Sequence, residues 1–105
     1  MGPTNAQEFR YQLDEDAEIY AVLYTAAGQP TGYSVVLLAL LDGGEARTVR
    51  VYDDHEIGSH FHRFNRKGEK GPREKISAPG TGEAFNMALH DIRNGYREMI
   101  DAWLR

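Results

Sequence analysis

The chain has 105 residues and a formal net charge of −4, with 41% hydrophobic and 27% charged residues. This length and composition are typical of one globular domain, here spanning residues 1–105, and are too apolar for a disordered chain. The absence of cysteine excludes disulfide frameworks, zinc ribbons, cysteine nucleophiles and iron–sulfur clusters. Any chemistry must therefore come from other side chains.

The N-terminal segment, residues 1–17, has neither the basic start nor the apolar stretch of a secretion signal. It contains a run of acidic residues, and we expect it to be loose or to become ordered on a partner. The longest apolar run, Val35–Leu41, has seven residues, whereas a membrane-spanning helix needs about 20. The sequence therefore predicts a cytoplasmic protein with no membrane partner.

Several segments have the β-branched and aromatic composition of strands, separated by breaks that contain Gly or Pro. They are Ile19–Thr25, Tyr33–Leu41, Glu45–Tyr52, His60–Phe64 and Arg73–Ser77. The sequence Asp42-Gly43-Gly44 predicts a tight hairpin turn, because Gly tolerates a positive φ. In the following strand, alternation predicts Val49 and Val51 on one face and Tyr52 on the other.

The last segment, Glu83–Leu104, has the spacing of an amphipathic helix, with Thr81 as its N-cap. The apolar stripe that we expect to face the core consists of Phe85, Ala88, Leu89, Ile92, Tyr96, Met99, Ile100 and Trp103. The sequence thus predicts an α+β fold: an antiparallel β-meander of about four to five strands followed by one long C-terminal amphipathic helix.

The strand Tyr33–Leu41 is apolar on both faces, which is typical of a central strand covered on both sides. One helix covers only one face of a small sheet. The row of Val36, Leu38 and Leu40 therefore needs a second cover, from the N-terminal segment, a homo-oligomer, another protein, or closure of the sheet on itself.

Charge is distributed unevenly along the chain. Residues 1–46 carry seven acidic side chains and one basic side chain, whereas residues 47–75 carry eight basic and five acidic ones. Cations of the second segment can hold phosphates or simply keep a loop soluble. The candidate substrate-binding residues are Arg63, Arg66, Lys67, Lys70 and Arg73.

Three of the four histidines lie close together, at His55, His60 and His62, and Asp53 precedes them. In an extended segment, the last two imidazoles project from one face about 6–7 Å apart. Imidazoles can act as general base and general acid near neutral pH. We therefore take these four residues as candidate catalytic residues for RNA cleavage or another phosphoryl transfer, with strand and turn capping as the structural alternative.

A metal site is another use of the same residues, because His-x-His with a further His or Asp supplies three or four ligands. The nearest pattern is that of cupins, in which Glu follows three or four residues later. Six residues separate His62 from Glu69 here, so the match is poor. We expect no metal and no other cofactor.

The segment from Val51 to His62 is similar to the Tyr-Asp-Asn-x-His…Pro-His-x-His segment of the TumE-like toxins of bacterial toxin–antitoxin systems. In that family a meander precedes this segment, a Lys-x-Gly-Pro loop follows it, and a C-terminal helix ends the chain. Here Glu69-Lys70-Gly71-Pro72 and the helix keep that order, although Asp54 and Ser59 replace the usual Asn and Pro. The resemblance implies a cytoplasmic growth-inhibiting protein held in check by a DNA-binding antitoxin.

Three functions remain open at this point. The first is a toxin that acts on RNA or another phosphate-bearing substrate, as a metal-independent ribonuclease or phosphoryl-transfer enzyme. The second is a non-enzymatic interaction module that uses its apolar sheet face, and the third is a His-x-His metal-binding protein.

Overall fold

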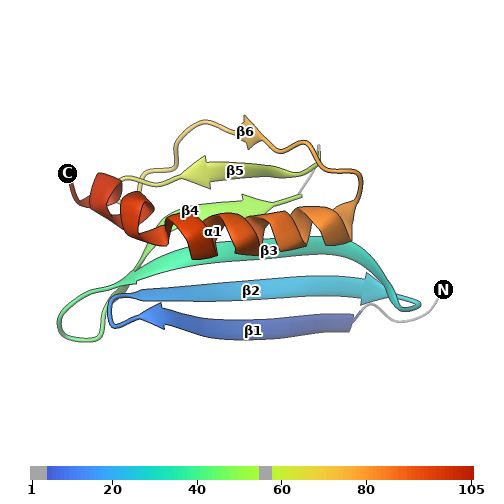
Figure 1. Cartoon of the computed structure of the whole chain (residues 1–105), viewed down its shortest axis with the longest axis horizontal. Helices are drawn as coiled ribbons and strands as arrows, with labels where there is room; N and C mark the ends of the chain where they lie inside the picture. Colours follow the sequence, from blue (N-terminus) through green and yellow to red (C-terminus); the bar gives the residue numbers. More distant parts are fainter. Residues whose placement is uncertain (1–4, 55–57) are drawn as a thin grey trace.

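The computed structural model describes residues 5–54 and 58–105, which form one antiparallel sheet of six strands and one helix (Figure 1). The elements in chain order are β1 (Asn5–Asp14), β2 (Ala17–Ala26), β3 (Gln29–Leu40), β4 (Ala46–Asp53), β5 (His60–Arg63), β6 (Glu74–Lys75) and α1 (Thr81–Leu104). Each strand pairs with its neighbour in the chain, so the sheet order is also the chain order. The predicted α+β meander with one C-terminal helix is confirmed.

The N-terminal segment differs from the expectation of a loose tail, because residues 5–14 form the edge strand β1. Its apolar residues recur at every second position, at Phe9, Tyr11 and Leu13, and all three pack against the core. Polar residues occupy the positions between them. This period of two is the pattern of a half-buried strand, and it outweighs the acidic run that follows.

The core lies between α1 and one face of the sheet. Ile19 lies opposite Leu37, Val35 lies opposite Tyr52, and all four side chains are buried. From the predicted helical stripe, the buried residues are Phe85, Ala88, Ile92, Ile100 and Trp103, while Leu89, Tyr96 and Met99 are partly buried against them. The helix prediction is therefore confirmed in its C-terminal end and its facing. The prediction of Thr81 as N-cap is wrong, because α1 begins at Thr81 and the N-cap is Gly80, which makes no side-chain cap hydrogen bond.

The hairpin between β3 and β4 is confirmed, and the alternation predicted for β4 is wrong at Val49. Gly43 and Gly44 have φ values of 87° and 82°, which favour glycine. The β3–β4 register shifts between Leu37 and Leu38, so that Val49 is buried in the same core as Tyr52. An extra residue of this kind reverses the alternation of the side chains that precede it.

The second face of the sheet carries the predicted row of Val36, Leu38 and Leu40, on the side away from α1. These side chains are partly exposed. The register places Val36 opposite Val51, and Val51 in turn opposite His62, so the histidines of β5 lie on this same face. No helix within residues 5–54 and 58–105 combines the length and apolarity needed to cross a membrane.

Candidate functional site: a groove between helix and sheet

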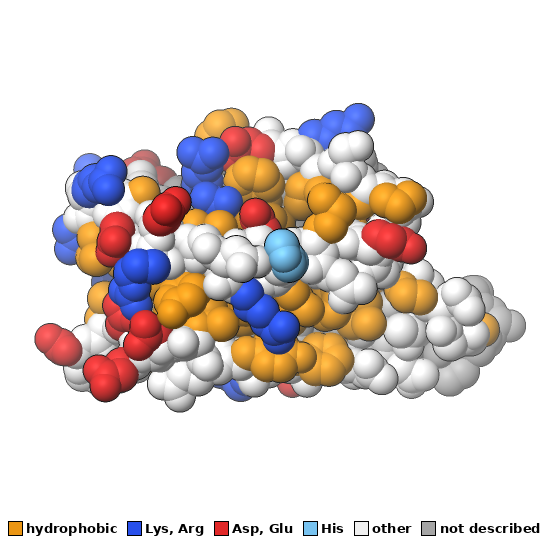
Figure 2. All heavy atoms as spheres, in the orientation of Figure 1, with side chains coloured by type: hydrophobic (Ala, Val, Ile, Leu, Met, Phe, Trp, Pro, Cys, Tyr) orange, Lys and Arg blue, Asp and Glu red, His pale blue; other side chains and the backbone are white. Residues whose placement is uncertain are grey.

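A groove of about 710 Å³ lies between α1 and the strands β4 to β6 (Figure 2). It arises because α1 packs mainly on β3 and less on β4, which leaves the helix side of β5 and β6 uncovered. Its apolar lining comes from Tyr52, Phe61, Ile76, Met87 and Ala88, and its polar lining from Ser77, Asn86, His90 and Asp91. Met87 is 45% exposed, so an apolar side chain lies at the mouth of the groove.

A polar cluster of Arg50, Tyr52 and Asp91 joins the sheet to the helix at this groove. The Tyr52 hydroxyl donates a hydrogen bond to Asp91 Oδ2, and Arg50 Nη1 donates to Tyr52 Oη at 3.3 Å. Arg50 Nη1 lies 3.9 Å from Asp91 Oδ2, and its guanidinium lies 4.9 Å from the centre of the Phe61 ring. The charged groups Arg50 and Asp91 therefore lie in direct contact with the aromatic residues that line the groove, Tyr52 and Phe61.

The environment of Tyr52 keeps its hydroxyl protonated. Burial and the hydrogen bond to the Asp91 carboxylate raise the pKa of Tyr52 well above its ordinary value of 10.0. The Asp91 side chain is 57% exposed, so it can accept further hydrogen bonds from the solvent side. The arrangement suits a ligand with an apolar part and a hydrogen-bond donor.

The predicted catalytic residues Asp53, His60 and His62 are brought together, on the sheet face opposite the groove. His60 Nε2 lies 2.8 Å from Asp53 Oδ1, and His60 Nδ1 lies 2.8 Å from the Gly58 carbonyl oxygen. The two imidazole centres are 5.1 Å apart, and the residues are only 4% and 6% exposed. Both nitrogens of His60 thus face protein oxygens instead of solvent.

His62 donates from Nδ1 to the Gly71 carbonyl oxygen at 2.8 Å, and its buried Nε2 has no hydrogen-bond partner among the described residues. The fourth candidate, His55, lies outside the described residues. Within residues 5–54 and 58–105, no group of three or more His, Asp or Glu side chains is arranged to hold a metal ion.

The predicted substrate-binding cations lie in several different environments. Arg63 lies opposite Arg50 on the helix side of the sheet, where it pairs with Glu74 at 3.0 Å. Arg66 Nη1 donates to the Leu104 carbonyl oxygen at 3.4 Å. Lys67, Lys70 and Arg73 are exposed in the connection between β5 and β6.

The sequence interpretation missed the groove residues Arg50, Tyr52, Phe61 and Asp91 as a site. One signal was present, because Asp91 lies between Ala88 and Ile92 of the helical stripe, at the border of the apolar face. A tyrosine in a buried strand also requires a partner for its hydroxyl. The identity of that partner depends on how α1 lies on the sheet, which no local pattern specifies.

The fold and groove define a small α+β protein with a meander sheet, one covering helix and a helix–sheet groove. The chain belongs to the family described as domain of unknown function DUF7718, whose model matches residues 4–105. Neither the curated proteins nor the solved structures contain a match to it.

Proposed function

We propose that this protein is a binding module whose site is the groove between α1 and the strands β4 to β6. The observation that supports this function is the open apolar groove with the Arg50–Tyr52–Asp91 cluster beside it. Its volume of about 710 Å³ lies in the range of small-molecule sites, which are apolar with a few converging polar groups.

The lining indicates the chemistry of the ligand. The Phe61 ring, Ile76 and Met87 offer contacts to a flat apolar group. Asp91 already accepts the Tyr52 hydroxyl and is exposed enough to accept an N–H from a ligand. We therefore expect an aromatic group that carries a cationic amine.

Tryptamine and indole are suitable probes, because they share a ring and differ in the amine. In an NMR titration of the ¹⁵N-labelled full chain, we expect both probes to perturb the amides around Phe61, Ile76 and Met87. Asp91→Asn should weaken the binding of tryptamine and leave that of indole unchanged. Equal losses for both probes would contradict the role of the carboxylate.

The matched control variants are Met87→Lys and Leu104→Lys, because both side chains are 45% exposed on α1. Met87 lines the groove, whereas Leu104 does not. We expect Met87→Lys to abolish the binding of both probes and Leu104→Lys to preserve it. Perturbations that are scattered over the molecule, or that survive in Met87→Lys, would rule out the groove as the site.

A second candidate function is that of a toxin component of a toxin–antitoxin system, acting on RNA or another phosphate-bearing substrate. The resemblance of Val51–His62 and Glu69–Pro72 to the TumE-like toxins favours it. Exposed Lys67 and Lys70 support contacts to phosphates. The partner would be a DNA-binding antitoxin, and the partly exposed row of Val36, Leu38 and Leu40 is a surface available to it.

Induced expression in a bacterium, with and without the neighbouring gene, tests this second candidate. We expect growth inhibition that the neighbouring gene relieves. The variants His60→Ala and His62→Ala, checked for folding by circular dichroism, test the acid–base role. Inhibition by both folded variants would remove the catalytic role, and normal growth with the wild-type chain would remove the toxin function.

A further inference from the structure

The two edges of the sheet are very different. β6 has two residues, whereas β1 has ten, and within the described residues β1 pairs only with β2. β1 contains no proline, and most of its residues are exposed. A long edge strand presents a row of unpaired backbone N–H and C=O groups, to which another strand can pair.

The charges of β1 make it complementary to itself in one register. In an antiparallel pair with two-fold symmetry, one residue of the strand faces its own copy. A centre at Glu8 or at Arg10 would place two like charges directly opposite each other. A centre at Phe9 places Glu8 opposite Arg10 of the second copy, twice, and avoids both repulsions.

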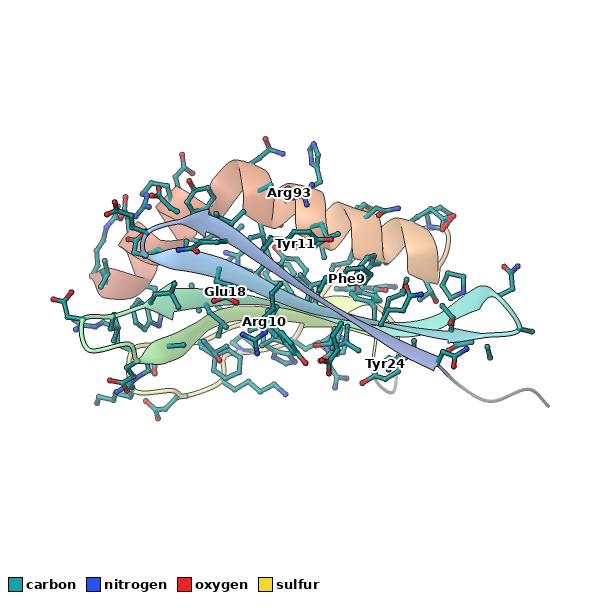
Figure 3. The ribbon with its side chains drawn as sticks, turned by 90° about the horizontal axis from the view of Figure 1, so that it is seen from below. Phe9, Arg10, Tyr11, Glu18, Tyr24 and Arg93 are labelled. Carbon is teal, nitrogen blue, oxygen red and sulfur yellow. The ribbon has the colours of Figure 1, made fainter. Side chains whose placement is uncertain are left out.

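The aromatic residues of β1 place an apolar contact at the centre of this register. Phe9 stacks on Tyr11 with ring centres 6.2 Å apart, and both side chains are only partly buried on the helix side. Figure 3 shows Phe9, Tyr11 and Arg93 together toward α1, and Arg10 on the other side of the strand. In the register centred at Phe9, the two Phe9 rings face each other across the axis, and each Tyr11 lies diagonally beside the Phe9 ring of the other copy.

We propose that β1 pairs antiparallel with β1 of a second copy of this chain, with the two-fold axis at Phe9. The two sheets then form one continuous sheet, and both helices lie on the same side of it. This inference is independent of the groove and of its ligand.

Sedimentation of the full chain tests the assembly, and a cysteine substitution tests the register. We expect a species of twice the 11.8 kDa chain mass. The chain has no cysteine, so Phe9→Cys introduces a single thiol. Facing residues of antiparallel strands have Cα atoms about 4.5–5.5 Å apart, and a disulfide bridges Cα distances of about 4.4–6.8 Å.

Tyr11→Cys is the matched control for the cross-link. In the proposed register Tyr11 faces Gln7 of the second copy, so the two introduced thiols lie four residues, or about 14 Å, apart. We expect oxidation to convert most of the Phe9→Cys chain to a covalent dimer and to leave Tyr11→Cys uncross-linked. Equal cross-linking of the two variants, or none in Phe9→Cys, would overturn the register.

A charge exchange provides a second test that does not alter the core. Glu8→Lys and Arg10→Glu each place like charges opposite each other in a homodimer, so each variant alone should sediment as a monomer. Mixed together, they restore both opposite-charge pairs, and we expect a heterodimer. A wild-type chain that stays monomeric, or a dimer that resists both substitutions and dissociates with Leu38→Asp, would overturn the proposal.

Discussion

Tyr52 is a core residue that also belongs to the candidate site. Its ring is buried in the sheet beside Phe61, at a centre distance of 5.2 Å, and its hydroxyl reaches Asp91 on the helix. Because the pKa of Tyr52 is raised in the folded protein, the neutral hydroxyl is favoured by folding. This contribution to stability is complete below the unfolded pKa of about 10 and is lost as the pH rises above it.

We expect Tyr52→Phe to reduce the alkaline loss of stability. In the wild-type chain, the free energy of unfolding should fall above pH 10, because the unfolded tyrosine ionises first. Removal of the hydroxyl removes the Tyr52 part of that slope and leaves the part that comes from Tyr20 and Tyr33, whose pKa values are also raised. It also lowers stability near pH 7 by about 1 kcal/mol. Denaturant titrations between pH 8 and pH 11 measure both effects, and equal slopes for the two proteins would contradict the prediction.

The buried pair of His60 and His62 connects segments that are apart in the chain. Through His60, β5 contacts Asp53 of β4 and the Gly58 carbonyl, and through His62 it contacts the Gly71 carbonyl. These contacts hold β5 against its neighbouring segments. The two histidines therefore have a structural role, which the catalytic hypothesis does not include. The acid–base role of these residues stays a prediction.

His60→Ala should destabilise the fold strongly, whereas His90→Ala should not. The first substitution leaves a cavity and removes two buried contacts, at a cost of about 2–3 kcal/mol. His90 is exposed on α1, so its removal should change stability by less than about 0.5 kcal/mol. Thermal unfolding of both variants checks this, and similar midpoints would show that the His60 contacts contribute little.

At the scale of elements, periodicity predicted most of the fold. The helical stripe around Ile92 and the turn at Gly43 and Gly44 are local signals. Each was sufficient to predict its element, the helix α1 and the β3–β4 hairpin. β1 was missed although Phe9, Tyr11 and Leu13 alternate, because its acidic end suggested a solvated tail. The burial of Val49 follows from a register shift against β3, and pairing between strands is not encoded by the alternation of one strand.

The β1–β2 turn is attached to α1 through Arg97. Its guanidinium contacts Asp14 at 3.0 Å and Asp16 at 2.7 Å. The Glu15 backbone N–H and Arg97 lower the pKa of Asp14, and Arg97 lowers that of Asp16. Their contribution to stability is therefore present above the ordinary aspartate pKa of 3.8 and is lost as the pH falls below it.

Arg97→Met should lower the melting temperature at pH 7, and this deficit should shrink as the pH falls from 3.8 toward 2, because protonation of the two aspartates removes the ion pairs. Arg93→Met is the control on the same helix, because Arg93 lies over the Tyr11 ring at 5.0 Å and this contact contains no carboxylate. Calorimetry at the two pH values measures the difference. A deficit of Arg97→Met that persists at pH 2 would contradict the ion-pair explanation.

At the scale of the whole molecule, a cluster of acidic residues and a cluster of lysines lie in different connections of the sheet. Asp14, Glu15 and Asp16 lie at the β1–β2 turn, whereas Lys67 and Lys70 lie in the connection between β5 and β6. The sequence revealed this separation, but not that Arg63 and the histidines would lie on opposite faces of the sheet. The groove could not be predicted from the sequence either, because its shape depends on the placement of α1 over strands that are remote in sequence.

If the connection between β5 and β6 binds RNA, Lys67→Gln with Lys70→Gln should weaken that binding. For a single-stranded RNA oligonucleotide, loss of two phosphate contacts makes the salt dependence shallower by about 1.4 in the logarithmic slope. Fluorescence anisotropy at several salt concentrations measures it, with Arg93→Met as the control. An unchanged slope would exclude these lysines as phosphate contacts.

The chain order of the sheet has a consequence for how the protein folds. Each strand pairs with the next strand in the chain. The pairing of neighbouring strands therefore costs little loop-closure entropy. The packing of α1 on β3, in contrast, joins segments separated by the β4–β6 half of the sheet. We expect the meander to form first and the helix to dock last, and the bond from Tyr52 to Asp91 forms only at that step. A ligand in the groove would therefore stabilise the docked position of the helix. Because docking comes last, the ligand would slow unfolding more than it speeds folding.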